Sequence, residues 1–326
     1  MFSISFQTAV LAIAQIFAMG AVGFYLVRRQ IVDQAGLKLL SFLSVNVCFP
    51  LFIFYQITHN FHPDQTASWW KYPLINVTLI LGGLLLTALI SFISSRKAPP
   101  DETLTACSFH NAGYIPLLMA MALPLGASAG AVYTAVILSI IGFDTCLWSL
   151  GVWLMTRKHL PAGRPADRPR VELKNLFNPP LISMALAVIL VLTHGHTFLW
   201  DPLVKPIKMM GDAALALAML VIGGNLALTN LVNVDFDRIG RVVLIKLVLT
   251  PLIALLVLTT LRLDPIWSFV FMVQACMPTA ITLSIIGRTY GTRNQEFINQ
   301  SIFFTHVVCL ITVPIFLTLF AGYVHG

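Results

Sequence analysis

Ten apolar stretches, separated by short polar segments, run along the chain. Most approach the roughly 20 residues that an α-helix needs to cross a bilayer. They span approximately Phe6–Val27, Leu37–Gln56, Pro73–Ile93, Leu104–Leu123, Ala131–Met155, Pro179–Leu192, Pro202–Leu228, Val242–Leu261, Pro265–Ile286 and Phe297–Val324. Helix-start signals support this division, because Asn178, Asp201 and Asp264 each precede a proline at the first helical position. The pattern predicts an all-α polytopic membrane protein with ten transmembrane helices.

The basic residues are distributed unevenly among the loops between these helices. Fifteen fall in the odd-numbered loops, namely Arg28, Arg29, Lys38, Arg96, Lys97, Arg157, Lys158, Arg164, Arg168, Arg170, Lys174, Arg238, Arg241, Arg288 and Arg293. Four fall in the even-numbered loops, namely Lys71, Lys205, Lys208 and Arg262. Cytoplasmic loops carry an excess of Lys and Arg. We therefore expect the odd-numbered loops in the cytoplasm and both termini on the outer side.

The composition agrees with a membrane protein. Only 10% of the 326 residues are charged and 58% are hydrophobic, whereas a soluble domain is about 25% charged. An ordinary soluble enzyme, a disordered chain and a nucleic-acid module are thereby excluded, and the net charge of +7 reports loop orientation. The five cysteines lie in apolar stretches without metal-binding spacing, so we expect reduced thiols and no cofactor.

A basic, proline-containing segment at 157–177 divides the chain into residues 1–156 and 178–326, each with five predicted helices. Because five is odd, a second copy of the unit must insert upside down, as in many secondary transporters. The fourth helix carries Asn111 before Pro116 and the ninth carries Gln274 before Pro278, and the two prolines are 162 residues apart. The sequence predicts two inverted five-helix repeats joined by a cytoplasmic linker.

Pro116 and Pro278 are expected to break their helices, since a proline inside a helix removes a hydrogen bond and clashes with the preceding turn. In lipid, an opened backbone is tolerated only where protein or a water-filled cavity satisfies it. Two such breaks would place two half-helix N-termini near the membrane midplane, where their partial positive charge suits an anion. Asn111 and Gln274 would satisfy the opened backbone and contact the substrate. A packed kink without a ligand is the alternative.

Several motifs occur in an order that resembles one known family. They are Asn46–Phe54 (NVCFPLFIF), Ser108–Pro116, Asn178–Ile182 (NPPLI), Gly211–Ala227, Leu249–Leu252 (LTPL), and Met277–Ala280 (MPTA) followed by Tyr290-Gly291. The ordered set resembles the auxin efflux carrier family, particularly its bacterial members described as malonate or organic-acid permeases. One departure is Ile115, where family members often have glycine before the proline; with Tyr114 it is expected to narrow the site.

The resemblance implies a fold similar to that of bile-acid/sodium symporters. Helices 1, 2, 6 and 7 would form a scaffold domain, and helices 3–5 and 8–10 a transport domain that carries an organic anion by elevator motion. The broken helices 4 and 9 would cross at the substrate. The expected substrate-binding residues are Asn111, Gly113, Tyr114, Pro116, Gln274, Pro278, Thr279, Asn46 and Asn225. Interhelical hydrogen bonding is the alternative role for Asn46 and Asn225.

Few ionisable residues lie within the apolar stretches, where they are functional candidates by default. Asp144 would bind a coupling proton or cation, or pair with another group of the transport domain. Asp212 follows Lys208 by four residues, which favours an outer-end ion pair over a role in lining the site. Lys246 is expected to snorkel toward the cytoplasm rather than enter the site. His306 is expected to be a hydrogen-bonded packing residue, with proton relay as the alternative.

Two other patterns are weak signs of function. His59, His62, His194 and His196 face the same predicted side, but interfacial loop histidines are commoner than metal sites, so we predict no metal. Residues 126–130 (GASAG) match the G-x-S-x-G motif of hydrolases. That motif requires a strand-to-helix turn, whereas here it joins two helices. We therefore predict that the protein is not an enzyme.

The sequence thus predicts a secondary transporter of small organic anions, such as dicarboxylates or malonate, in the inner (plasma) membrane. Its partners would be the anion and lipid, with a homodimer as an option and no nucleic acid. A sodium-coupled symporter of the bile-acid type is the nearest alternative, which the absence of Asp and Glu from the ninth helix disfavours. A membrane sensor that binds a small acid without moving it is the alternative from another class.

Overall fold

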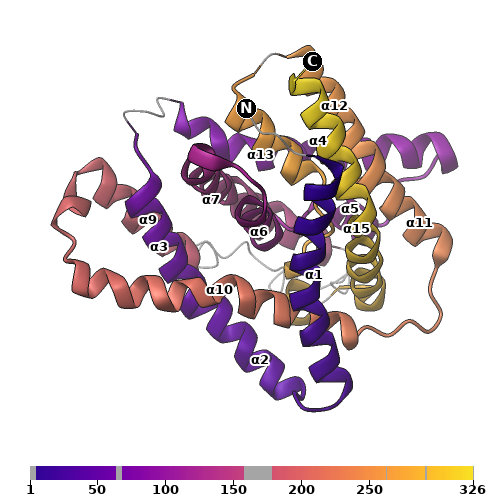
Figure 1. Ribbon diagram of the computed structural model, residues 1–326. Helices are drawn as coiled ribbons and strands as arrows, with labels where there is room; N and C mark the ends of the chain where they lie inside the picture. The colour runs from indigo at the N-terminus through magenta and orange to yellow at the C-terminus, as the bar shows by residue number, and fades with distance from the viewer. Residues whose placement is uncertain (1–4, 64–67, 158–177, 262, 291, 326) are drawn as a thin grey trace.

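The computed structural model describes residues 5–63, 68–157, 178–261, 263–290 and 292–325, so most of the predicted linker lies outside it. Within these ranges the chain is helical and forms no β-strand (Figure 1). The α-helices are α1 (Phe6–Arg28), α2 (Gln34–Leu43), α3 (Phe49–Asn60), α4 (Tyr72–Ser95), α5 (Asp101–Ser108), α6 (Tyr114–Ala122), α7 (Ala129–Cys146), α8 (Val152–Thr156), α9 (Pro179–Leu192), α10 (Asp201–Ala227), α11 (Phe236–Leu244), α12 (Thr250–Thr260), α13 (Pro265–Ala275), α14 (Thr282–Tyr290) and α15 (Gln295–His325). The predicted all-α class is confirmed.

Three pairs of these helices continue through short π-helical segments and form single rods. The segments are η1 (Ser44–Cys48) between α2 and α3, η4 (Leu147–Gly151) between α7 and α8, and η8 (Ile245–Leu249) between α11 and α12. A proline follows η1 and η8 closely, at Pro50 and Pro251. Because proline lacks an N–H, it disturbs the hydrogen bonding of the preceding turn, and the wider π-turn accommodates this without ending the rod.

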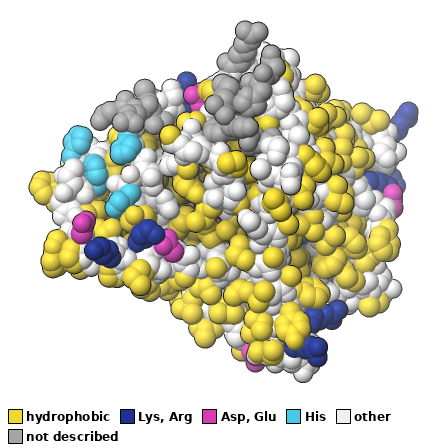
Figure 2. Space-filling view, viewed as in Figure 1, with side chains coloured by type: hydrophobic (Ala, Val, Ile, Leu, Met, Phe, Trp, Pro, Cys, Tyr) yellow, Lys and Arg dark blue, Asp and Glu magenta, His cyan; other side chains and the backbone are white. Residues whose placement is uncertain are grey.

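Seven helical rods in the described part of the chain are long and apolar enough to cross a membrane. They are Phe6–Arg28, Gln34–Asn60, Trp69–Ser94, Gly126–Thr156, Asp201–Ala227, Phe236–Thr260 and Gln295–Tyr323, and they coincide with the predicted helices 1, 2, 3, 5, 7, 8 and 10. The other three predicted helices are not long single rods. The sixth, α9, has only 14 residues, at its predicted bounds, and the fourth and ninth are each split in two. Figure 2 shows hydrophobic side chains over most of the visible face, with the charged ones toward its margins. The chain is therefore a multi-pass membrane protein.

Glycines bring the backbones of neighbouring rods into direct contact. A Cβ atom added at Gly23 of α1 would lie 2.0 Å from the Leu220 carbonyl oxygen of α10, and one at Gly223 would lie 1.8 Å from that of Gly20. Small residues permit this close approach between membrane helices. As a result α10 packs along α1 and also contacts α2 and α3, while α9 packs on α3 (Figure 1). The remaining helices form a second group, in which α4 packs on α7 and α5, and α11 on α15.

Two breaks lie side by side within the second group. Between α5 and α6, and between α13 and α14, the chain unwinds over residues 109–113 and 276–281. The unwound segments pair in antiparallel fashion: the Asn111 N–H donates to the Pro278 carbonyl at 2.8 Å, and the Ala280 N–H donates to the Phe109 carbonyl at 2.9 Å. Each break thereby satisfies part of the backbone that the other exposes.

Of the two prolines expected to break their helices, Pro278 lies in a break and Pro116 lies just after one. Pro116 lies in the first turn of α6, after the break, while Pro278 lies within the second unwound segment. A first-turn proline removes no helical hydrogen bond, and its fixed φ suits the start of a helix. The expectation that Pro116 breaks a helix at its own position is therefore wrong; Pro116 begins the second half of that helix instead.

Candidate substrate site

A cavity of about 600 Å³ lies between the two groups of helices, beside the first break. Its polar and charged lining comes from six parts of the chain: Lys38, Ser41, Ser44 and Asn46 on the second rod, His110 and Asn111 with Tyr114 at the first break, Asp144 on α7, Asn178 before α9, Asn225 on α10 and Thr282 at the start of α14. Of the predicted substrate-binding residues, Asn111, Gly113, Tyr114, Asn46 and Asn225 line this cavity.

Three helices begin at the cavity wall, namely α6, α9 and α14. The first N–H groups of a helix have no intrahelical partner, and this end carries about half a positive charge. At α9 the Asn178 side chain already accepts from the Leu181 N–H at 2.9 Å. The described first turns of α6 and α14 contain no acidic residue. Both helix ends therefore present positive potential to an anion in the cavity. The start of α6 has no side-chain cap and also offers N–H donors, whereas at α14 the Leu283 and Ser284 N–H groups already donate to the Ala280 and Ile281 carbonyls.

Asn111 presents a further donor. Its side chain is 5% exposed, and its Nδ2 has no hydrogen-bond partner among the described residues. Its backbone N–H is already used by the Pro278 carbonyl, which fixes the residue at the crossing. A buried donor without a partner costs about 1–3 kcal/mol. An acceptor in the cavity, such as a carboxylate oxygen, would remove this penalty.

Gln274 and Thr279 lie behind the crossing rather than in the cavity wall. The Gln274 Nε2 donates to the Ala112 carbonyl at 2.9 Å and to the Ser139 Oγ at 3.2 Å. The Thr279 hydroxyl donates to the Ala106 carbonyl at 2.8 Å, and both side chains are fully buried. Neither they nor Pro116 and Pro278 are among the residues that line the cavity. In this structure their contacts hold the two breaks together.

A second buried layer supports the same crossing. The Asn76 Oδ1 lies 2.8 Å from the His110 Nε2, and its Nδ2 donates to the Ser139 carbonyl at 2.8 Å. Because Ser139 also receives Gln274, these four side chains link α4, α7 and both breaks. Sequence reasoning missed Asn76, His110 and Ser139, although polar residues within apolar stretches were a usable signal.

Comparison with known protein families matches residues 8–162 and 168–317 to the family described as membrane transport protein. The chain belongs to this family. It is the auxin efflux carrier family predicted from the ordered motifs, and that prediction is confirmed. The role of this family is membrane transport, and a cavity between helices beside the broken helices suits that role.

Curated relatives of the transporter come from plants and bacteria. PIN-LIKES 1 of Arabidopsis thaliana is 22% identical over 97% of this chain and 79% of its own length. PIN-LIKES 7 of the same plant is 19% identical over 83% of this chain and 86% of its own. The "Putative malonate transporter" of Rhizobium meliloti is 34% identical, over 34% of this chain and 35% of its own length.

The remaining polar residues of the cavity include two that the sequence did not suggest. Lys38, which we counted as a loop cation, lines the cavity, as does Asn178, which we treated only as a helix cap. Asp144 also lines it. The amides of Asn46 and Asn225 donate to Phe42 and Val221 carbonyls of their own helices, at 3.2 and 2.9 Å. The interhelical bonds considered for Asn46 and Asn225 are therefore not the ones these amides make.

The shape of the site near Tyr114 differs in part from expectation. The rings of Tyr114 and Phe49 lie 4.9 Å apart, and both residues line the cavity. Ile115 is fully buried and is not among the lining residues. Tyr114 thus lines the cavity, whereas Ile115 packs into the core.

Asp212 and His306 lie away from this cavity. The Asp212 carboxylate and the Lys208 ammonium form an exposed ion pair at 2.5 Å, as the four-residue spacing predicts. His306 is fully buried, its Nδ1 donates to the Ile302 carbonyl at 2.8 Å, and its ring lies 6.4 Å from that of Phe17 on α1. These contacts agree with packing for His306 and with an ion pair for Asp212.

Lys246 overturns one expectation. Its side chain is 1% exposed, so it does not snorkel to the surface. The residue lies in η8, whose π-turn packs against α4, α5 and α15. Sequence reasoning placed it correctly in the eighth helix but could not see which face of the rod it occupied.

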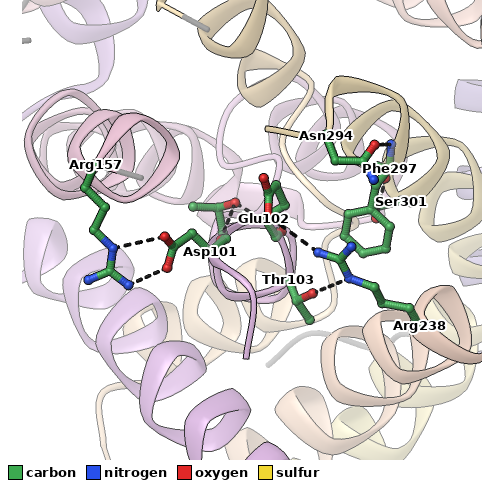
Figure 3. A network of polar contacts seen from close by, with 9 residues as sticks. Asp101, Glu102, Thr103, Arg157, Arg238, Asn294, Phe297 and Ser301 are labelled. Carbon is green, nitrogen blue, oxygen red and sulfur yellow. Dashed lines mark hydrogen bonds and ion pairs between the residues drawn. The ribbon is translucent and has the colours of Figure 1, made fainter. Parts of the chain in front are cut away.

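A network of ion pairs surrounds the start of α5 (Figure 3). Asp101 forms two hydrogen bonds with the Arg157 guanidinium, and this raises the pKa of Arg157. Glu102 lies 3.5 Å from the Arg238 guanidinium, whose Nε donates to the Thr103 hydroxyl at 2.8 Å. Both carboxylates are buried, and their charge suits a helix N-terminus. The network ties the start of α5 to the end of α8 and to α11.

The GASAG segment, His194 and His196 also have defined places. Gly126–Ser128 form a 3₁₀ turn that leads into α7, which is not the strand-to-helix turn of a nucleophile elbow. The His194 and His196 rings lie 6.4 Å apart. In the described ranges, no group of three or more His, Cys, Asp or Glu side chains is placed to hold a metal ion.

Proposed function

We propose that the protein is a secondary transporter that carries small organic anions, such as dicarboxylates, across the inner (plasma) membrane. One observation carries this proposal: the starts of α6 and α14, which have no acidic residue in their described first turns, and the unpaired Asn111 amide meet at one cavity of about 600 Å³. Donors and positive potential together suit a carboxylate. The relative named as a malonate transporter supports a dicarboxylate in particular.

In this proposal one carboxylate lies at the starts of α6 and α14, with the Asn111 amide and the backbone near Gly113 as donors. The Lys38 ammonium, which also lines the cavity, attracts the second carboxylate. Tyr114 limits the size of the anion. Asn46 and Asn225 provide the opposite wall from the scaffold helices. The remaining four predicted residues, Pro116, Gln274, Pro278 and Thr279, act by holding the broken helices in place.

We further propose ten transmembrane helices arranged as two inverted repeats of five, 1–156 and 178–326. The scaffold domain consists of α1, the α2–α3 rod, α9 and α10, and the transport domain of the remaining helices, a division that the packing of the two groups supports. Elevator motion moves the broken helices past the scaffold. With both termini outside, Lys38 and Asn178 lie at the cytoplasmic ends of their helices, so the cavity faces the cytoplasm.

For coupling, Asp144 is the candidate that the geometry favours over Asp212 and His306, because it alone of the three lines the cavity. A sodium-coupled symporter of the bile-acid type is the competing proposal. Its clearest requirement, a carboxylate in the ninth helix, is not met by residues 265–290, which contain no Asp or Glu. A sensor that binds the anion without moving it is the other competing proposal.

Flux into proteoliposomes tests these proposals. The full-length protein should exchange labelled malonate, and Asn111→Ala and Pro278→Ala should both reduce the rate. Asn60→Ala is the matched control, because this amide bonds only to Gln56 of its own helix in the described structure and is not a lining residue of the cavity. Wild-type rates in both Asn111→Ala and Pro278→Ala would refute the site. Binding of malonate without flux would favour the sensor.

A further inference from the structure

A small pocket adjoins the main cavity, between the two groups of helices. Its volume is about 20 Å³, which is room for roughly one water-sized group. It shares Ile222, Asn225 and Ile281 with the lining of the main cavity. Its other polar lining consists of Thr229 beyond α10, Ser284 and Arg288 on α14, and Asn299 on α15. The small pocket is therefore continuous with one wall of the proposed anion site.

Arg288 is the charged residue of the small pocket. It is exposed, and none of the ion pairs in the described ranges includes it. Arg288 and Ser284 are four residues apart and both line the small pocket, so they share one face of α14. Helical side chains tilt toward the N-terminus of their helix, which directs the long Arg288 side chain back toward Thr282 at the wall of the main cavity. A cation without an ion-pair partner thus lies beside the anion site.

Asn299 supplies a hydrogen-bond donor at the same pocket. Its Oδ1 accepts from the Ser284 hydroxyl at 2.7 Å and from the Gln295 Nε2 at 3.0 Å. Because these bonds occupy the acceptor end of the Asn299 amide, its Nδ2 remains for an acceptor in the pocket. The donors on the other side are already used: the Asn225 Nδ2 and the Thr229 hydroxyl donate to the Val221 and Asn225 carbonyls, at 2.9 and 3.2 Å.

The two available donors both lie on helices of the proposed transport domain, α14 and α15. An anion that moves with this domain keeps a counter-charge throughout only if the cation moves too. Lys38 lies on the α2–α3 rod of the scaffold, so it can attract the anion on entry but does not travel with it. Arg288 does travel with α14. A guanidinium also binds a carboxylate through directed, charge-assisted hydrogen bonds.

We propose that the small pocket is the subsite for the second carboxylate of a dicarboxylate, bound by Arg288 and the Asn299 amide. The first carboxylate lies at the starts of α6 and α14 beside Asn111. One carboxylate oxygen is similar in size to a water molecule, so it fits the volume of the small pocket. This inference rests on the proposed transport function and deepens it, because it makes short dicarboxylates the preferred substrates over monocarboxylates of the same size.

Malonate and its monoamide, malonamate, test the subsite, since they have nearly the same size and differ by one carboxylate. The KM of each is measured with the full-length protein in proteoliposomes, and the wild type should prefer malonate. We expect Arg288→Gln to raise the KM for malonate by about tenfold, as for the loss of a hydrogen bond between charged groups, and to leave the KM for malonamate within about twofold. Asn299→Asp keeps the Oδ1 acceptor, replaces the donor by a negative oxygen, and should act in the same direction.

Arg293→Gln is the matched control. It removes an exposed positive charge from the same end of the chain segment, and Arg293 lines neither the main cavity nor the small pocket. The KM for both substrates should stay at the wild-type value. Arg288→Lys keeps the charge but loses the forked geometry of the guanidinium, so it should give a smaller rise in KM that is again confined to malonate.

Two results would overturn the subsite. One is a KM that Arg288→Gln raises equally for malonate and malonamate, because a general loss of attraction does not distinguish one carboxylate from two. The other is an unchanged KM for malonate in both Arg288→Gln and Arg288→Lys, which would leave the proposed function standing and refute only the subsite. A wild type that transports neither substrate would instead refute the proposed function, and the subsite with it.

Discussion

The two broken helices look alike in sequence but differ in what their side chains do. At the first break Asn111 faces the cavity with an unpaired amide, whereas at the second break Gln274 donates to the Ala112 carbonyl and lies outside the cavity wall. Each break opens a helix N-terminus toward the cavity. The comparison shows that the backbone of both breaks serves the site, while only the first break contributes its amide side chain.

A related contrast separates the halves of each broken helix. The first halves, α5 and α13, begin with Asp101, Glu102 and Asp264, so the positive ends of their dipoles are compensated. The second halves, α6 and α14, begin without an acidic residue in their described first turns. Their positive ends remain available, and this difference identifies the place where an anion would be bound.

Loss of the Arg238 charge, which pairs with Glu102 at the start of α5, should have the largest effect on stability. Arg238→Met removes the partner of the buried Glu102 and the donor to Thr103. We expect a loss of about 3 kcal/mol, because breaking a buried ion pair leaves the other charge uncompensated. Arg241→Met, at an exposed pair with Asp237, should stay within about 0.5 kcal/mol. Denaturant unfolding of both variants measures the difference, and equal effects would contradict the buried role of this network.

Substitution of the amide at each break should affect different properties, stability at Gln274 and malonate flux at Asn111. Gln274→Leu leaves the buried Ala112 carbonyl without its partner and should lower stability by about 2 kcal/mol. Asn111→Leu removes a donor that bonds to no described side chain or backbone group, so stability should hold while malonate flux is lost. Thermal unfolding and proteoliposome flux, measured on both variants, test the pair. A reversed pattern would mean that the second break, not the first, supplies the amide of the site.

A carboxylate placed at an uncompensated helix end should exclude the anion. Thr282→Asp adds an acid to the first turn of α14 at the cavity wall. The helix dipole stabilises a carboxylate at this position, and its negative charge repels an anionic substrate. Flux should fall by about tenfold or more, since a like charge at a binding surface costs several kcal/mol. Thr282→Asn is the neutral control and should keep most of the flux. Equal flux in the two variants would contradict the helix-end site.

The smallest effect is expected at Lys38. This exposed residue lines the cavity and would attract the anion across water, where the interaction is screened by salt. Lys38→Gln should raise the KM for malonate by about threefold and leave kcat unchanged, as for an exposed charge pair. The difference from the wild type should shrink at high salt. A loss of kcat would show instead that Lys38 takes part in the moving step.

Much of this architecture could be predicted from the sequence, because apolar length, proline and helix-capping residues act locally. The seven long rods and the two breaks follow from such signals. The rotation of each rod does not, which is why Gln274 was expected in the site and Lys246 at the surface. Arg157 and Arg238 were counted as loop charges, because their partners on α5 are 56 and more than 130 residues away. Long-range pairs of this kind depend on the packing of the whole fold.

We propose that a small carboxylate binds at the starts of α6 and α14 beside Asn111. A thermal-shift titration of the purified protein with malonate measures this binding, because a ligand that binds only the folded state raises its stability, by about 2.7 kcal/mol at 100 times Kd. We expect a concentration-dependent rise in Tm for the wild type and Asn60→Ala, and none for Asn111→Ala or Thr282→Asp. An equal rise in all four proteins would show that the anion binds elsewhere.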